Sequence, residues 1–299
     1  MLLEYTVLSQ LHFRSKDFTV RYFEFQVTTQ IKMRDIITKS GLFLSLLAYV
    51  SAWDGRIVFE DNFDGTRLDL NKWEYQEGCG NQYGGNNLQC YTRNNVAVQN
   101  GNLVITARRE NMEDKEYTSG RIRQKGSGFA YGAYVVRARM SRGDHLHPAL
   151  WLFYRETDCR YEEIDIAEYR GQPSEARKLA MAAHWGKEWY AITSKETKVD
   201  TPQDLSNGFH EYAVLWRPAS IEWYIDNVKY FEASLTDGSF TRDPNKLPCR
   251  GEPKPFMMQS NFIFNIAVGG GFFGGFPPMD PATWTQPNMQ VDWVRVYQE

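Results

Sequence analysis

The chain has 299 residues, which is enough to bury a sizeable core in one large domain or in two ordinary ones. Its 34 Lys and Arg residues against 37 Asp and Glu residues give a formal net charge of −3. There is no basic surplus to attract nucleic acid or anionic lipid, so neither is an expected partner. Aromatic residues make up 15% of the chain, including 9 Trp. Such rings either fill a core or stack on a flat-faced ligand such as a sugar.

Residues 1–52 are predicted to be an N-terminal extension whose last part, 33–52, is a signal peptide. There a short basic stretch precedes an apolar run that is well short of the roughly 20 residues of a membrane span. The run ends in small residues suited to cleavage before Trp53. Because the signal begins at Met33, we expect a gene-model start that is too early; the alternative is an uncleaved internal anchor. We therefore predict a secreted protein with one mature domain, 53–299, and no membrane segment.

Four cysteines follow the predicted signal: Cys79, Cys90, Cys159 and Cys249. An even number in a secreted chain favours disulfides over a metal site, and no Cys-x-x-Cys pair argues for zinc. Three pairings are open. One of them joins Cys79 to Cys90 across a short loop rich in Gly and Asn, and leaves Cys159 to pair with Cys249. Free buried thiols are the alternative.

From residue 53 onward, alternating or β-branched and aromatic runs recur between Gly, Asn, Asp and Pro residues, as expected of strands. The predicted strands are 102–107, 133–139, 211–216, 221–225, 262–268 and 291–297. Asp226 and Asn227 are predicted to form a tight hairpin turn. The best helical signal is a single turn over 201–205. Many short strands without intervening helices predict an all-β sandwich or barrel.

Three acids, Glu163, Asp165 and Glu168, interleave with apolar residues in a predicted core strand. On a regular strand the first two share a face and Glu168 points the other way. A β-bulge near 166–167 would return Glu168 to the same face, with the bulge residues turned into the core. Crowded like charges raise at least one pKa, as a nucleophile and general acid pair requires. The sequence therefore predicts a bulged strand that presents three carboxylates.

The spacing of these acids bears on the reaction type. A retaining glycosidase holds its two carboxyls about 5–5.5 Å apart and an inverting one about 6.5–9.5 Å apart. Four effective steps of about 3.3 Å place the Cα atoms of Glu163 and Glu168 roughly 13 Å apart on a straight strand, so their side chains converge only on a curved, concave sheet. The alternative is a half-exposed strand with a solvated acidic face. A buried strand over 148–153 and an imidazole at His184 nearby favour the site.

A set of ordered motifs over 56–299 carries a resemblance to a known family. The motifs are 59–65 with 72–73, 84–92, 100–107, 118–121, 131–132, 148–151, 163–168, 209–213, 265–270 and 291–297. With these motifs the chain resembles glycoside hydrolase family 16, in its laminarinase-like branch. The resemblance implies a concanavalin-like β-jelly-roll sandwich of two antiparallel sheets with a concave substrate groove. It also implies retaining endo-hydrolysis of a β-glucan.

The resemblance assigns roles residue by residue. By match to the family motif, Glu163 would be the nucleophile, Asp165 the residue that tunes it and Glu168 the general acid/base. The bulged form of the motif is typical of 1,3-β-glucanases. Further groove contacts implied by the match are Trp151, His184, Asn86, Arg121 and Asn265, with Phe272 and Phe273 as stacking rings. Core packing is the alternative reading of Trp151 and of His184.

Many family members bind one structural calcium ion, and no cofactor is required for catalysis. Glu60, the carbonyl of Gly101 and Asp292 match those calcium positions. An ordinary surface ion pair explains Glu60 or Asp292 equally well.

The chain also departs from the family pattern. His145 and His147 stand before Pro148, where members usually have Trp, so two imidazoles replace rings that hold sugar. The alternative is that they are space-filling loop histidines; a metal site is disfavoured because no third ligand is evident. Altered rings beside intact acids suggest a catalyst with shifted specificity.

Six further tryptophans are divided between core and rim. Those predicted in the core are Trp73, Trp216, Trp223 and Trp293, and those predicted near the groove are Trp185 and Trp189.

We therefore expect a secreted, monomeric endo-1,3-β-glucanase whose partner is a β-glucan polysaccharide. One alternative is a recognition protein that binds β-1,3-glucan without cutting it, and another is a family member that acts on a different β-glucan or on a galactan. The retention of all three acids favours an enzyme, because a pure binding module has no need of them.

Overall fold

The computed structural model describes residues 53–79, 83, 86–156, 159–187, 192–237, 255–274 and 279–299. The predicted extension and signal peptide, Trp189 and Cys249 lie outside these residues. The described part is built from strands, with single 3-10 turns at Arg93–Asn95, Pro173–Glu175, Gly271–Phe273 and Pro281–Thr283. None of its helices has the length and apolar character needed to cross a membrane.

One large sheet has the strand order β16-β15-β14-β9-β18-β5-β4, with β1 paired to β18. Every pair within it is antiparallel. Its strands are β1 (Arg56–Asp61), β4 (Val96–Gln99), β5 (Asn102–Thr106), β9 (Gly132–Arg139), β14 (His210–Trp216), β15 (Ser220–Ile225), β16 (Val228–Ser234) and β18 (Asn288–Gln298). We call it the eight-stranded sheet.

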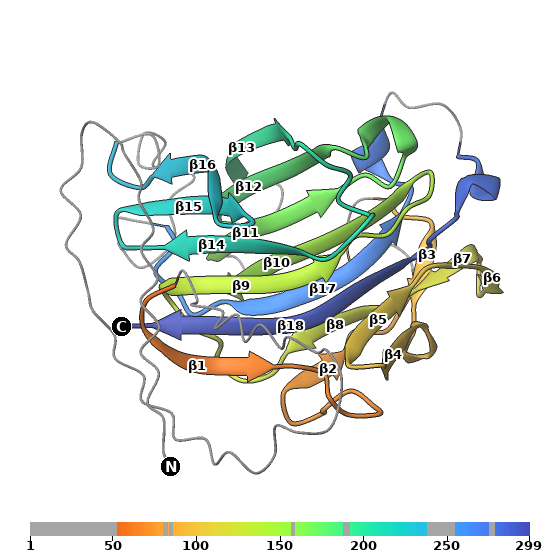
Figure 1. Cartoon of the computed structure of the whole chain (residues 1–299), viewed down its shortest axis with the longest axis horizontal. Coiled ribbons are helices and arrows are strands. Elements are labelled where there is room, and N and C mark those ends of the chain that lie inside the picture. Colours follow the sequence, from red (N-terminus) through yellow and green to blue (C-terminus); the bar gives the residue numbers. More distant parts are fainter. Residues whose placement is uncertain are drawn as a thin grey trace, which may run out of the picture. The chain divides into compact units, whose positions relative to one another are not determined.

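The second large sheet has the order β13-β12-β11-β10-β17-β8-β2 and is also antiparallel throughout. Its strands are β2 (Trp73–Tyr75), β8 (Arg121–Gln124), β10 (Leu146–Glu156), β11 (Arg160–Tyr169), β12 (Lys178–Gly186), β13 (Ile192–Asp200) and β17 (Asn261–Val268). A small third sheet, of β3 (Gln89–Tyr91), β7 (Lys115–Ser119) and β6 (Arg108–Met112), lies at one end of the two large ones (Figure 1).

The core lies between the two large sheets, which face each other in Figure 1. Trp73, Trp216 and Trp223 are fully buried in it, as predicted. The indole Nε1 of Trp223, on β15, donates a hydrogen bond of 2.8 Å to the backbone carbonyl of Asp165, on β11. This hydrogen bond connects the acid-bearing strand to the opposite sheet through the core. Two antiparallel sheets packed on one core confirm the predicted sandwich.

Two tryptophan predictions were wrong, for the same reason. Side chains on a strand alternate between its two faces. On β12, His184 therefore faces away from the core and Trp185 faces into it, with only 2% of its surface exposed. On β18, the buried Val294 and Val296 fill the core, and Trp293 lies outside it under the guanidinium of Arg295, 4.4 Å from the ring centroid.

The six predicted strands are all present, and the predicted hairpin turn joins β15 to β16. Asp226 and Asn227 adopt φ angles of 48° and 65°, a left-handed conformation that Asp and Asn tolerate better than most residues. The helical turn predicted over 201–205 was wrong. The Thr201 hydroxyl donates to the Gln203 carbonyl (2.8 Å), and this local bond competes with a helical hydrogen-bond pattern.

Candidate active site

A β-bulge in β11 brings the three acids to one face of the seven-stranded sheet. From Asp165 to Glu168 the strand advances three residues, while the paired segment of β12, from Ala182 to Ala180, advances two. The extra residue lies at 166–167, and both of those side chains are fully buried in the core. The predicted bulge is therefore confirmed. We call the side of the sheet that carries the acids the carboxylate face.

Glu163 is held by a phenol and lies among cationic groups. The Tyr161 hydroxyl, two residues earlier on β11, donates to Glu163 Oε2 at 2.5 Å. Burial raises the pKa of Glu163, and the charge of Glu168 adds to that rise. The charge of His184, the Tyr161 hydrogen bond and the charge of Arg121 act in the opposite direction, and favour the ionised carboxylate. Burial also raises the pKa of Tyr161, which keeps its hydroxyl a donor.

Asp165 and His184 form an ion pair at the centre of the site. Asp165 is 3% exposed, and its Oδ2 lies 3.1 Å from His184 Nε2. Burial, with the charges of Glu163 and Glu168, raises the pKa of Asp165 well above its ordinary value. Burial alone lowers the pKa of His184, but the contact with Asp165 and the charges of the three acids outweigh it and raise the pKa to about 9. The raised pKa of His184 keeps the imidazole protonated at neutral pH, next to Oδ2 of Asp165.

The other nitrogen of His184 fixes the orientation of the ring. Its Nδ1 lies 2.6 Å from the hydroxyl of Ser194, on the neighbouring strand β13. With Nε2 against Asp165, the imidazole is held from both sides. His184 therefore presents a cation to the acids at neutral pH, a role that a space-filling core histidine would not have.

Glu168 stands apart from this group and contacts a different histidine. Its Oε1 lies 3.0 Å from Nε2 of His147, on β10. His147 is one of the two imidazoles that replace tryptophans of the family pattern. The two outer acids of the motif therefore have different partners, a phenol for Glu163 and an imidazole for Glu168.

Trp151, on β10, is partly exposed on the carboxylate face and is held there from below. Its Nε1 donates to Oδ1 of Asn265, at 2.8 Å, and the guanidinium carbon of Arg121 lies 4.8 Å from its ring centroid. Arg121 Nε in turn donates to Gln76 Oε1 at 2.6 Å. Both Asn265 and Arg121 are buried. Asn265 and Arg121, both predicted as groove contacts, thus hold the Trp151 ring in place, and Arg121 adds a positive charge next to the ring.

The two predicted stacking rings pack against neighbouring side chains. Phe273 is 3% exposed and packs on His145, with ring centroids 4.6 Å apart. Phe272 lies parallel to His147 at 3.7 Å, and the guanidinium carbon of Arg170 lies 4.2 Å from its centroid. Two groups at such distances occupy opposite faces of one ring, so both faces of Phe272 are covered. Neighbouring side chains thus cover the faces of both rings in this structure, and stacking of either ring on a sugar stays a prediction.

Asn86 is exposed and has a φ angle of 51°, in the left-handed region that Asn tolerates. Sequence reasoning missed Tyr161, Ser194 and Arg170. A period-two reading of β11 would have found Tyr161, which shares a face with Glu163 and Asp165. No local signal identifies Ser194, whose place depends on the register of β13 against β12.

Within the described ranges, one group of side chains has the spacing of a metal site: Glu163, Asp165 and His184, whose ligand atoms lie within 4.8 Å of one another. A metal ligand must be deprotonated. Since the pKa of His184 is raised to about 9, a metal ion would have to displace a proton from the imidazole at neutral pH.

The predicted calcium set lies elsewhere. The Asp292 carboxylate accepts a hydrogen bond from Arg137, and Glu60 Oε2 lies 3.6 Å from Arg295 Nε. This arrangement is the ion-pair alternative that the sequence left open for both acids. Calcium binding by Glu60, Gly101 and Asp292 stays a prediction.

The Cys79–Cys90 disulfide is present. Cys249 lies outside the described residues, so its pairing with Cys159 stays a prediction.

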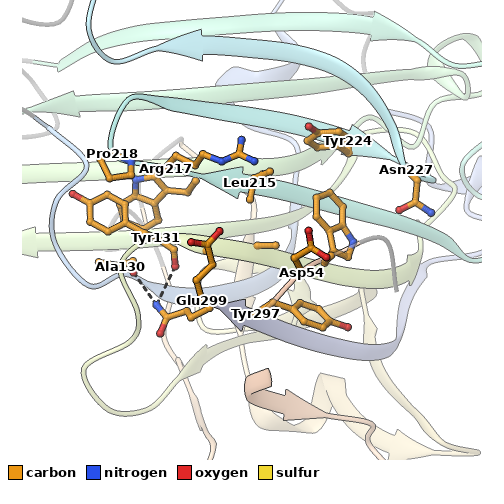
Figure 2. Close-up of a pocket in the computed structure, with 15 residues that line it drawn as sticks. Asp54, Ala130, Tyr131, Leu215, Arg217, Pro218, Tyr224, Asn227, Tyr297 and Glu299 are labelled. Atoms are coloured by element: carbon orange, nitrogen blue, oxygen red, sulfur yellow. Dashed lines mark hydrogen bonds between the residues drawn. The ribbon is translucent and has the colours of Figure 1, made fainter. Parts of the chain in front are cut away.

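A pocket of about 680 Å³ lies over the eight-stranded sheet, on the side turned away from the main core. Figure 2 shows Tyr131, Tyr224 and Arg217 in its wall. Gln298, which also lines the pocket, donates hydrogen bonds to the carbonyls of Ala130 and Tyr131. None of the three acids lines it. The acid chemistry therefore belongs to the carboxylate face and not to this pocket.

The model of the family described as glycosyl hydrolases family 16 matches residues 84–252. The chain belongs to this family. It is 34% identical over 275 residues to a glucan endo-1,3-beta-glucosidase of Cryptopygus antarcticus, covering 84% of this chain and 95% of that protein. The match establishes that the protein is a glycoside hydrolase.

Solved structures of family 16 members agree in fold. The laminarinase of Rhodothermus marinus is 31% identical, with a TM-score of 0.67 over 83% of this chain and 98% of the other. The laminarinase catalytic domain of Thermotoga maritima is 29% identical, with a TM-score of 0.67 over 82% and 99%. The predicted jelly-roll sandwich is thus confirmed.

Proposed function

We propose that this family 16 hydrolase is a retaining endo-1,3-β-glucanase in which Glu163 is the nucleophile and Glu168 the general acid/base. The observation that carries the proposal is the bulge in β11, which sets both acids on one face but in different surroundings. Glu163 lies among a phenol, an imidazolium and a guanidinium that favour its carboxylate form. Glu168 lies outside that group, beside His147. The names of the relatives support a β-1,3-glucan as substrate.

The proposed reaction has two steps. In the first, the Glu163 carboxylate attacks the anomeric carbon, and Glu168 gives its proton to the departing glycosidic oxygen, leaving a glycosyl ester on Glu163. In the second, the Glu168 carboxylate takes a proton from water, whose oxygen attacks the same carbon and releases Glu163. His184 keeps its proton throughout, and its positive charge stabilises Glu163 when it leaves as a carboxylate.

The test is reducing-end release from laminarin, followed by the anomeric configuration of the first products. The wild type should release β-anomers, and Glu163→Gln should lose activity while it keeps its fold and its affinity for laminarin. Full activity in Glu163→Gln would refute the nucleophile assignment. Tight binding without cleavage of any β-1,3-, mixed-linkage or galactan polymer would favour the recognition protein, and cleavage of a galactan alone would change the substrate.

We also propose that the enzyme is secreted, on the basis of the signal pattern over 33–52. Protein recovered from the culture medium should begin at Trp53.

A further inference from the structure

His147 lies between Glu168 and a stack of side chains that fixes its plane. Its Nε2 lies 3.0 Å from Glu168 Oε1. Its ring is parallel to that of Phe272, with centroids 3.7 Å apart and an interplanar angle of 8°. On the far side of Phe272 lies the guanidinium of Arg170, 4.2 Å from the ring centroid. The order of the stack is therefore Arg170, Phe272, His147, with Glu168 at the edge of the imidazole.

The stack is anchored on the strand that carries the acid. Arg170 follows Glu168 by two positions and comes directly after the end of β11. Its Nη2 donates a hydrogen bond of 2.7 Å to the backbone carbonyl of Phe272. Arg170 therefore contacts both the ring and the backbone of Phe272, in the segment after β17. Phe272 is thereby tied to the end of β11. An imidazole stacked on a ring fixed in this way has little freedom to turn away from Glu168.

The contact is sheltered from water. The side chains of His147 and Glu168 are 14% and 18% exposed. Pairs on an open surface contribute little because solvent competes for both partners. A hydrogen bond at this depth, made by a ring that is already immobilised, holds its acceptor in one orientation.

We propose that His147 is a positioning residue for Glu168, which commits Oε1 to the imidazole and leaves Oε2 as the oxygen that exchanges the proton. The inference rests on the proposed function. Nε2–H of His147 donates to Oε1 in both steps. In the first step Oε2 gives its proton to the glycosidic oxygen, and in the second Oε2 takes one from water. His147 neither gains nor loses a proton, so the balance of each step is unchanged.

The test uses two substrates that differ in their need for an acid. Laminarin has a poor leaving group that must be protonated, whereas dinitrophenolate departs from 2,4-dinitrophenyl β-laminaribioside without a proton. His147→Phe keeps a ring for the stack and removes Nε2. It should lower kcat/KM on laminarin roughly 10- to 100-fold, the size of loss expected when a reacting group is misplaced. The KM for laminarin and the kcat/KM on the aryl glycoside should change by no more than about threefold, because neither depends on where the acid points.

Two further variants separate positioning from folding. His147→Gln retains an N–H donor and should recover part of the loss on laminarin. His210→Asn is the control: this imidazole lies on β14, in the eight-stranded sheet, and contacts Asp226. This variant should leave kcat/KM unchanged on both laminarin and the aryl glycoside. If His147→Phe does not fold, Phe272→Leu is used instead, because it removes the ring that fixes the plane of His147. It should lower kcat/KM on laminarin by a smaller factor than His147→Phe, again with little change in kcat/KM on the aryl glycoside.

An equal loss on both substrates, or unchanged activity on laminarin, would overturn the inference. Failure of the proposed function is distinguishable, since Glu163→Gln would then remain active, or the wild type would cleave neither substrate.

Discussion

The raised pKa of His184 makes a quantitative prediction about stability and pH. In the folded protein this pKa is about 9, against an ordinary value of 6.5, so the folded state binds a proton that the unfolded state releases. Such a group contributes stability that is fully present below pH 6.5 and is lost as the pH rises to about 9. At 1.36 kcal/mol per pKa unit, the upper limit of this contribution is roughly 3 kcal/mol. The side chain is 16% exposed, so little of it is screened by solvent.

The perturbation is His184→Gln, which keeps an N–H donor near Asp165 but cannot be charged. Denaturant unfolding at a series of pH values between 5.5 and 9.5 gives the free energy of unfolding of each protein. The excess stability of the wild type over the variant should fall by about 1–3 kcal/mol between pH 6.5 and 9 and then level off. In an Asp165→Asn background the pH-dependent excess should shrink, because the partner that holds the proton is gone. A difference that stays constant across the whole range would refute the raised pKa of His184.

Three other predictions follow from the geometry of the site. Deletion of Ala167 removes the bulge residue and turns Glu168 toward the core, so laminarin hydrolysis should be lost; activity within tenfold of wild type would contradict this reading of β11. Trp151→Phe leaves the buried Oδ1 of Asn265 without its donor and should cost about 1–3 kcal/mol in urea unfolding, with a higher KM for laminarin. Cys79→Ser opens the disulfide that spans 11 residues and should lower the unfolding free energy by roughly 2–3 kcal/mol, while unchanged stability under oxidising conditions would argue against that bond.

The strands and the carboxylate face were predictable because both depend on local periodicity. Alternation of apolar and polar residues located strands such as β9 and β14, and the two-residue period placed Glu163 and Asp165 together. The five-residue offset from Glu163 to Glu168 conflicts with that period. Only a bulge reconciles the offset with a shared face, so the irregularity was itself readable in the sequence.

The surroundings of the acids depend on contacts that no local pattern encodes. Trp151 and its partner Asn265 are 114 positions apart, and Arg170 reaches Phe272 across 102. Which side chains meet across such distances depends on strand register and on the packing of loops. For that reason the sequence predicted Phe272 and Phe273 as sugar platforms, whereas the folded chain covers their faces with His147, Arg170 and His145. The sequence by itself determined the strand, its acids and their common face. Tyr161, the partner of Glu163, lies on the same strand, but only the tertiary structure decided that His184 meets Asp165 and that His147 meets Glu168, because strand pairing brings those segments together.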